Sequence, residues 1–350
     1  MKVSMNGPRY LMRWNDAGDQ RVHRDVLLTT HRLGELAQFS ATGITELIDR
    51  HDRSRLFLAT MGDNPAHPNQ WRRGSTTNHD GKAMLEFIQR GRLQLSLQNL
   101  QANPTIRRIA LRLIEELVEC QPGLRASHAA SELAISSATA SQYYRFHIRP
   151  TTLWHLRGRQ RVWIYPAGEP FVARQTLEQA IQQGLTAAPY FEPAFDDQSG
   201  IIDLEPGQML ALPQYTPYRT ANLDGTNVTL RTDYVTGQTI RQNEIHLANR
   251  LLSKYLPTPL SSRTEGCLAL AKRWLSRLIG YRLIQRRSPA ADGEAVSDWA
   301  LDQAQETFYL DNTAPDGIRF LQPPLAQRAT LAAPVSQTSV NLSPVAVLEH

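Results

Sequence analysis

The sequence is poor in cysteine and contains no long apolar run. Its 350 residues include two cysteines, Cys120 and Cys267, which lie far apart in helix-like surroundings. Neither a disulfide framework nor a zinc-binding cysteine cluster is expected, and we predict two buried free thiols. No stretch approaches the run of about 18 apolar residues that marks a membrane-spanning helix. The first residues also lack the apolar segment of a signal peptide, so a cytoplasmic protein is expected.

Several catalytic motifs are missing as well. The sequence has no P-loop, no GxGxxG fingerprint and no GxSxG motif. Nucleotide-binding and serine-hydrolase functions therefore find no support. The formal net charge is +5, but the basic residues are spread along the chain. A mildly basic surface is the simpler interpretation, and nucleic acid is not an expected partner.

What is present is the composition of an ordinary globular protein, with 41% hydrophobic and 20% charged residues. Residues 1–129 predict a mixed α/β region that packs on a barrel. Two short helical patterns follow His31, with Ser40 or Thr42 as the helix cap. The clearest helix of this region lies between Asn103 and Pro122. Its apolar residues at helical spacing are Ile106, Ile109, Leu113 and Leu117.

Residues 130–238 change in character, because short strand patterns alternate with proline and glycine turns. The stretch "LWHLRGRQRVWIYP" at 153–166 predicts a strand, a tight turn and a second strand. Regular short strands of this kind favour a β-sandwich or a barrel. A helical pattern, "RQTLEQAIQQGL", interrupts them.

Residues 239–287 return to helical patterns with strong apolar faces. Residues 288–350 are rich in alanine, proline, serine and threonine and predict a poorly structured tail. The final Leu348–His350 is interpreted as a vector-derived remnant and left out of the fold prediction.

Three motifs together carry a resemblance to a known family. They are "LWHLRGRQRVWIYP" at 153–166, "EPFV" at 169–172, and "DLEPGQMLALPQYTPYRTANLDGTNVTLRTDYVT" at 203–236. In these motifs the chain resembles the bacterial cupin-like proteins related to JmjC-domain hydroxylases, which are Fe(II)/2-oxoglutarate oxygenases. The resemblance implies an α+β fold. It consists of a double-stranded β-helix with N-terminal α/β elements and C-terminal helices.

The same resemblance implies an iron site built from His-x-Asp on one strand and a histidine on a late strand. Counting back from Trp154 places Arg145 at the first histidine and His147 at the carboxylate. A shift of two residues would instead make His147 the first ligand and put Arg149 at the carboxylate. Neither register restores His-x-Asp.

Two further positions depart from the family pattern. Tyr218 stands in "PQYTPYR" where the late histidine is expected, and Gln160 stands in "GRQR" where a lysine would hold 2-oxoglutarate. Arginine stays protonated and cannot ligate iron. At an effective dielectric near 20 it would repel a cation by ~4 kcal/mol per charge at close range. We therefore expect a degenerate metal site and no cofactor, with Fe(II) and 2-oxoglutarate as the alternative.

Each candidate residue has a functional and a purely structural interpretation. Arg145 either anchors an anion or forms an ion pair inside the barrel mouth. His147 is either a metal ligand or acid/base group, or a hydrogen-bonded strand histidine, which we favour. Tyr218 either acts as a hydrogen-bonding lid or fills the vacated cavity. The full set of barrel-pocket candidates is Arg145, His147, Thr152, Trp154, Gln160, Tyr218 and Asn227.

These residues predict a binding or partner protein without oxygenase activity. The rival is an enzyme, either an oxygenase with relocated ligands or one with metal-free chemistry on a small molecule or peptide. A small molecule or peptide in the barrel mouth and a protein partner are both open as ligands. The apolar faces of the C-terminal helices predict a homodimer, and the residues expected in the interface are Leu251, Leu252, Leu268, Leu275, Leu278 and Ile279.

Overall fold

The computed structural model describes most of the chain. The described residues are 9–13, 22, 24–62, 64, 66–67, 70–76, 79–121, 123–184, 188–253, 255, 261–287 and 306–321. Within them the α-helices are α1 (Ala41–Arg50), α2 (Gly81–Arg90), α3 (Pro104–Cys120), α4 (Arg174–Gln183), α5 (Gly237–Leu252) and α6 (Cys267–Arg287). Short 3-10 helices span Leu33–Glu35, Ala37–Phe39, Arg53–Arg55, Leu100–Ala102 and Pro193–Gln198.

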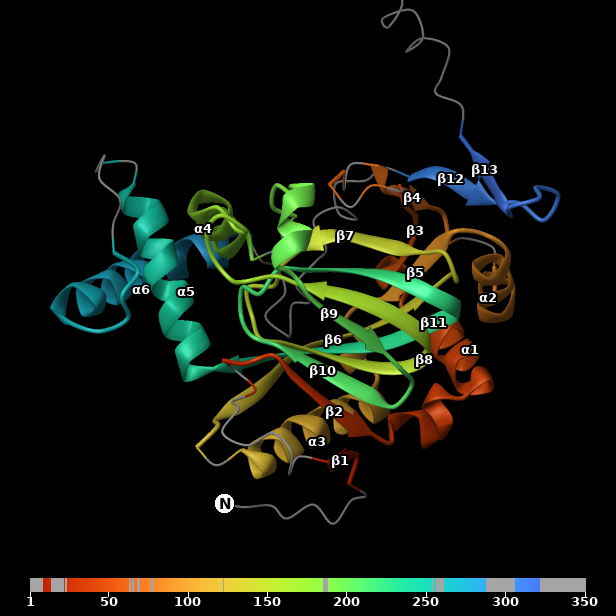
Figure 1. Cartoon of the computed structure of the whole chain (residues 1–350), viewed down its shortest axis with the longest axis horizontal. Coiled ribbons are helices and arrows are strands. Elements are labelled where there is room, and N and C mark those ends of the chain that lie inside the picture. The colour runs from red at the N-terminus through yellow and green to blue at the C-terminus, as the bar shows by residue number, and fades with distance from the viewer. Residues whose placement is uncertain are drawn as a thin grey trace, which may run out of the picture.

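Two long strands, β8 (Thr151–Ile164) and β11 (Tyr218–Thr236), organise the barrel (Figure 1). The first half of each strand pairs with the second half of the other. β10 (Gln208–Leu212) and β6 (Ala126–Ser136) complete one sheet in the order β10-β8-β11-β6. β9 (Gly200–Leu204) and β7 (Ser141–Arg145) complete the other in the order β9-β8-β11-β7. Two sheets that share their central strands form a double-stranded β-helix, so the predicted cupin/JmjC-like α+β fold is confirmed.

The expected tight turn between two strands at 153–166 is wrong. β8 runs unbroken through this stretch and bends at Gly158, whose φ is 74°. The left-handed conformation is accessible to glycine, which has no Cβ to collide with the backbone. The register with β11 shifts at the same place, between Asp224 and Val228. Both long strands therefore pass from one sheet to the other at this bend.

Further strands extend the first sheet on both sides. They are β2 (Leu27–His31) and β1 (Leu11–Arg13) beyond β10, and β5 (Leu93–Leu97), β3 (Leu56–Thr60) and β4 (Arg72–Gly74) beyond β6. β12 (Glu306–Leu310) then pairs with β4 in parallel, and β13 (Ile318–Phe320) pairs with β12. The prediction of a poorly structured tail is thus wrong for 306–320. Phe308 is fully buried there, with its ring against Gly74.

The N-terminal helices form where caps and apolar spacing agree. The Ser40 hydroxyl accepts a hydrogen bond from the Gly43 amide and caps α1, as predicted, whereas the pattern before it forms two 3-10 turns. Asn103 caps α3, with Pro104 in its first turn. The predicted apolar residues of α3 are all buried in the main core, together with residues of α1, α2 and the first sheet.

The helices α4, α5 and α6 lie together at the opposite end of the barrel from the β12–β13 hairpin (Figure 1). None of the helices in the described ranges is long and apolar enough to cross a membrane. The prediction of two buried thiols is wrong, because Cys120 is half-buried and Cys267 is exposed at the start of α6.

Candidate functional site

The interior of the barrel is lined by alternate residues of its strands. Leu153 and Val162 of β8 pack in one cluster with Leu204 of β9, Leu210 of β10 and Tyr218 of β11, which joins side chains of four strands from both sheets. Side chains alternate along a strand, so neighbours of these residues face outward. Val228 and Leu230 of β11 accordingly belong to the core that the N-terminal helices cover.

Arg145, His147 and Tyr218 come together inside the barrel, although Tyr218 lies far from the other two in sequence. Arg145 pairs with Tyr218 across β7 and β11, and the His147 Nε2 lies 2.8 Å from the Tyr218 hydroxyl. The Arg145 guanidinium lies 5.4 Å from the centre of the Tyr218 ring. All three side chains are buried. The pairing places Arg145, rather than Arg149, opposite Tyr218.

Neutral amides continue this arrangement away from Tyr218. The Arg145 Nη2 donates a hydrogen bond to the Gln142 Oε1. The Gln142 Nε2 in turn donates to the Gln94 Oε1 at 2.8 Å, and the Gln94 Nε2 donates to the Ser96 hydroxyl at 3.2 Å. A row of side chains therefore links β7 to β5 inside the protein.

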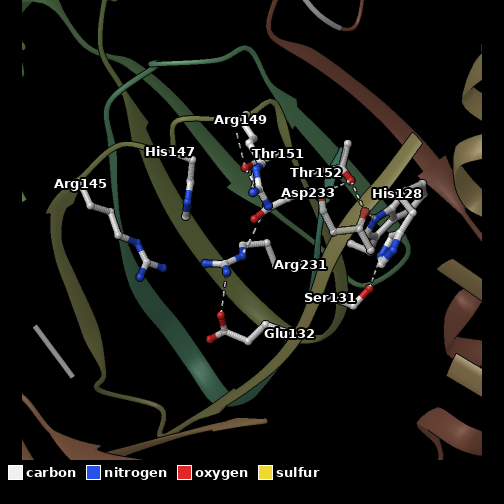
Figure 2. A network of polar contacts seen from close by, with 12 residues as sticks. His128, Ser131, Glu132, Arg145, His147, Arg149, Thr151, Thr152, Arg231 and Asp233 are labelled. Atoms are coloured by element: carbon white, nitrogen blue, oxygen red, sulfur yellow. Dashed lines mark hydrogen bonds and ion pairs between the residues drawn. The ribbon is translucent and has the colours of Figure 1, made fainter. Parts of the chain in front are cut away.

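A second buried arginine, Arg231, forms a charged network beside Arg145 and His147 (Figure 2). Its Nη2 lies 2.9 Å from the Glu132 carboxylate, and its Nε lies 3.6 Å from the Asp233 carboxylate. The Thr151 hydroxyl donates to Asp233 at 2.9 Å. Burial alone would lower the pKa of Arg231, but Glu132 and Asp233 outweigh it and leave the pKa raised. Arg231 therefore stays positively charged inside the barrel.

The environment holds both His147 and Tyr218 in their neutral forms. Burial lowers the pKa of His147 well below its ordinary value, and the charges of Arg231 and Arg145 lower it further. Burial also raises the pKa of the Tyr218 phenol, although both arginines oppose the shift. Charging either group would place an ion at a buried position, away from bulk solvent. A neutral imidazole and a neutral phenol thus share one hydrogen bond.

Gln160 faces the barrel interior on the same side of β8 as Val162 and Ile164. Its Nε2 donates to the Asn222 Oδ1 at 2.8 Å, directly across the strands. The Asn222 amide donates in turn to the Ser136 hydroxyl at 2.8 Å and to the Ser137 carbonyl at 2.6 Å. The position expected to hold a co-substrate carboxylate is instead tied into a chain of neutral amides.

Three predicted pocket residues lie elsewhere. Thr152 and Trp154 face outward, where the Trp154 Nε1 donates to the Thr232 hydroxyl at 2.9 Å and the ring packs in the main core. Asn227 packs against Gly158 at the strand bend, and its amide donates to two backbone carbonyls of the adjacent turn. The prediction that Thr152 and Trp154 line the pocket is wrong, because alternation along a strand does not reveal which face the helices cover. Asn227 lies at the strand bend instead.

Sequence reasoning missed the charged residues of the network. Arg231 and Asp233 occur two apart in "TLRTDYVT", which places them on one face of the strand. That spacing was a usable signal, since two opposite charges on the inner face of a barrel strand need buried partners. Glu132, on the neighbouring β6, carried no comparable signal.

The residues that gather here do not fit catalytic iron. The guanidinium of Arg145 offers no lone pair, and the His147 Nε2 is engaged with Tyr218. The carboxylates of Glu132 and Asp233 both lie against Arg231. Across the described residues, no group of three His, Cys, Asp or Glu side chains could hold a metal ion.

The strand pairing and the barrel interior define a protein with the cupin/JmjC-like fold. No protein-family model matches the chain, and no curated protein matches it in sequence.

Solved structures show similarity at low identity. The ribosomal oxygenase YcfD from Escherichia coli, in complex with cobalt and 2-oxoglutarate, matches with a TM-score of 0.44 and 13% identity over 80% of this chain and 68% of that chain. A cupin superfamily protein from Desulfitobacterium hafniense matches with a TM-score of 0.20 and 12% identity over 34% of this chain and 85% of its own. Hydroquinone 1,2-dioxygenase from Sphingomonas sp. TTNP3 matches with a TM-score of 0.23 and 14% identity over 31% of this chain and 60% of its own.

Proposed function

We propose that this chain is a binding or partner protein that keeps the cupin/JmjC-like barrel but holds no catalytic iron and has no oxygenase activity. The observation that carries the proposal is the hydrogen bond between His147 and Tyr218 under the Arg145 guanidinium. These three side chains fill the place where the family resemblance expects metal ligands. The positive charge of Arg145 at this place opposes a divalent cation.

Metal retention tests the proposal directly. The purified chain is loaded with Fe(II) or Mn(II) without air, desalted and analysed for metal content. We expect far less than one metal ion per chain. Near-stoichiometric retention that is lost in His147→Ala would overturn the proposal and revive the oxygenase.

Co-substrate turnover provides a second test. Gln160 cannot supply the charge-assisted hydrogen bond that a lysine would give to 2-oxoglutarate, and its amide is already bonded to Asn222. The loss of one such bond corresponds to ~1.5–3 kcal/mol, or roughly 10- to 100-fold in affinity. We expect no conversion of 2-oxoglutarate to succinate. Iron-dependent succinate formation by this protein would contradict the proposal.

A protein partner fits the surface better than a ligand deep in the barrel, because the protein's own side chains occupy the interior around His147. α6 turns Ala269, Lys272 and Ser276 toward the rest of the molecule. Its outward side exposes the large apolar side chains of Leu268, Leu270, Trp274 and Leu278. We therefore propose that α6 is an interface, and that the partner is a second copy of this chain.

A further inference from the structure

Two loops that contact each other lie beside the candidate site. His147 lies in the loop at 146–150, between β7 and β8, and Tyr218 follows the loop at 213–217, between β10 and β11. Tyr218 is fixed by strand pairing with Arg145 and Ile164, whereas His147 lies outside the strands. The relative position of His147 and Tyr218 therefore depends on what holds these loops together.

One side chain of α5, Asn243, contacts both loops. Its Oδ1 accepts hydrogen bonds from the Tyr215 hydroxyl at 2.6 Å and from the Gln214 Nε2 at 3.0 Å. Its Nδ2 donates to the Ile148 carbonyl at 3.2 Å. The Gln214 Nε2 also reaches the Ile148 carbonyl, at 3.1 Å, which closes a ring of hydrogen bonds between the loops.

The loops are also joined directly, next to the site. The Tyr215 amide donates to the His147 carbonyl at 2.9 Å. Tyr215 has a φ of 68°, a conformation that a residue with a bulky side chain adopts only when its surroundings enforce it. Its ring packs edge-on against His246 of α5, with centroids 5.6 Å apart. The hydroxyl bond to Asn243 and this ring contact both hold Tyr215 to α5.

α5 is a fixed support for these contacts. It starts where β11 ends, and the Thr236 hydroxyl caps it by accepting from the Thr239 amide. Glu244, the residue after Asn243, binds Arg273 at 2.8 Å and Arg277 at 2.5 Å, both on α6. α5 also packs against α4. α5 is thus held at its N-terminus by Thr236 and along its length by α4 and α6, while Asn243 points to the loops.

We propose that Asn243 is a positioning residue that holds the loop of His147 against the loop of Tyr218 and so keeps their hydrogen bond closed. Asn243 forms hydrogen bonds with Ile148 and Tyr215 of the two loops, and not with His147 or Tyr218 themselves. The inference concerns the geometry of the site and holds whether or not the chain proves to bind metal.

The test follows the site and the rest of the fold in one sample, by NMR of the full chain. In Asn243→Ala, the imidazole of His147 should titrate at a higher pH than in the unchanged protein. The Tyr215 amide should exchange with solvent faster by about tenfold or more. The amides of β5 serve as the internal reference for global unfolding, and His155, bonded to Thr229 and Gly158 at the strand bend, as the reference imidazole. Both references should stay unchanged.

Two further variants make the result specific. Arg241→Ala changes an exposed residue of the same helix and should leave both signals as they are. Tyr215→Phe removes only the hydroxyl bond to Asn243, keeps the ring, and should shift both signals in the same direction. It also provides the measurement if Asn243→Ala does not fold. An unchanged His147 titration in the folded variants would overturn the proposal, as would equal acceleration of the β5 amides.

Discussion

At the scale of single residues, buried polar side chains of the barrel interior contact one another. Arg231 is neutralised by Glu132 and Asp233, while His147 and Tyr218 satisfy each other. A buried ion pair contributes little net stability, but loss of one partner costs ~3–5 kcal/mol because a charge is left unpaired. The choice of residues in the barrel interior therefore depends more on the need to satisfy buried polar groups than on the attraction between those groups.

The buried histidines should make the protein less stable as the pH falls. In the unfolded chain a histidine titrates near pH 6.5, whereas burial lowers the pKa of His31 to about 4 and that of His147 well below its ordinary value. Below about pH 6.5 the unfolded state binds protons that the folded state does not bind, so the free energy of unfolding decreases. The decrease reaches at most about 1.4 kcal/mol per pH unit for each such histidine.

Urea denaturation at several pH values between about 7 and about 4.5 measures this decrease. His147→Gln should make the pH dependence shallower, by up to one proton bound on unfolding. An identical slope in the variant and the unchanged protein would show that His147 does not contribute.

The geometry of Arg145, His147 and Tyr218 also predicts a gain of function. If these positions correspond to a facial triad, the triple change Arg145→His, His147→Asp and Tyr218→His should create a site for Co(II) or Fe(II). Co(II) absorption and metal stoichiometry measure the outcome. Arg145→His alone is the control and should bind no metal, because the Tyr218–His147 hydrogen bond remains. A folded triple variant that binds no Co(II) would contradict the correspondence.

At the scale of elements, the bend in β8 decides how the two sheets meet. Gly158 has a φ of 74°, and a Cβ at this position would lie 2.6 Å from the Asn227 side chain. The Asn227 side chain is itself held in the turn of β11 by hydrogen bonds to the backbone carbonyls of Asp224 and Gly225. Backbone conformation and side-chain contact thus both require glycine.

Gly158→Ala should therefore destabilise the fold by about 1–3 kcal/mol. Gly225 is the matched control, since it also has a positive φ, of 53°, but has open space where a Cβ would lie. Gly225→Ala should be the milder change, and the double variant Gly158→Ala/Asn227→Ala should recover part of the loss. Chemical denaturation provides the comparison. Equal destabilisation by the two glycine variants would show that contact with Asn227 has no role.

At the scale of the whole molecule, the outward side of α6 exposes several large apolar side chains among the described residues. Trp274 is 66% exposed and Leu278 is 66% exposed, one helical turn apart. Arg273 and Arg277 are drawn to Glu244 on α5, so their charges are partly neutralised beside the apolar side chains. Of the predicted interface residues, Leu251, Leu252 and Leu275 are half-buried, and the side chain of Ile279 lies outside the described residues.

We expect the chain to form a homodimer through α6, because an isologous contact would cover the same face on both copies. Light scattering at a concentration of tens of micromolar should give twice the mass of one chain. Trp274→Glu should shift the mass toward the monomer. Ile201→Glu, at another exposed apolar residue on β9, is the control and should not. A monomeric mass for the unchanged chain would refute the dimer.

The local features of the sequence determined several elements on their own. Apolar residues at helical spacing predicted α3, and Ser40 was one of the two residues predicted to cap α1. The short strand patterns predicted a β-sandwich or a barrel, and the resemblance of the motifs at 153–166 and 203–236 to the cupin-like family favoured the barrel. The four differences from the family pattern, at Arg145, His147, Gln160 and Tyr218, could also be recognised from the sequence. Each depends only on the identity of one side chain and its place in a motif.

The tertiary structure decided which faces and partners those elements have. Alternation along β8 placed Thr152 and Trp154 on one side of the strand, but only the packing of the N-terminal helices makes that side the outer one. β12 pairs with β4 from the far end of the chain, and Arg231 meets Glu132 across β11 and β6. Such contacts join segments far apart in sequence. Their free energy comes from surfaces and charges that meet only after folding, so no local pattern records them.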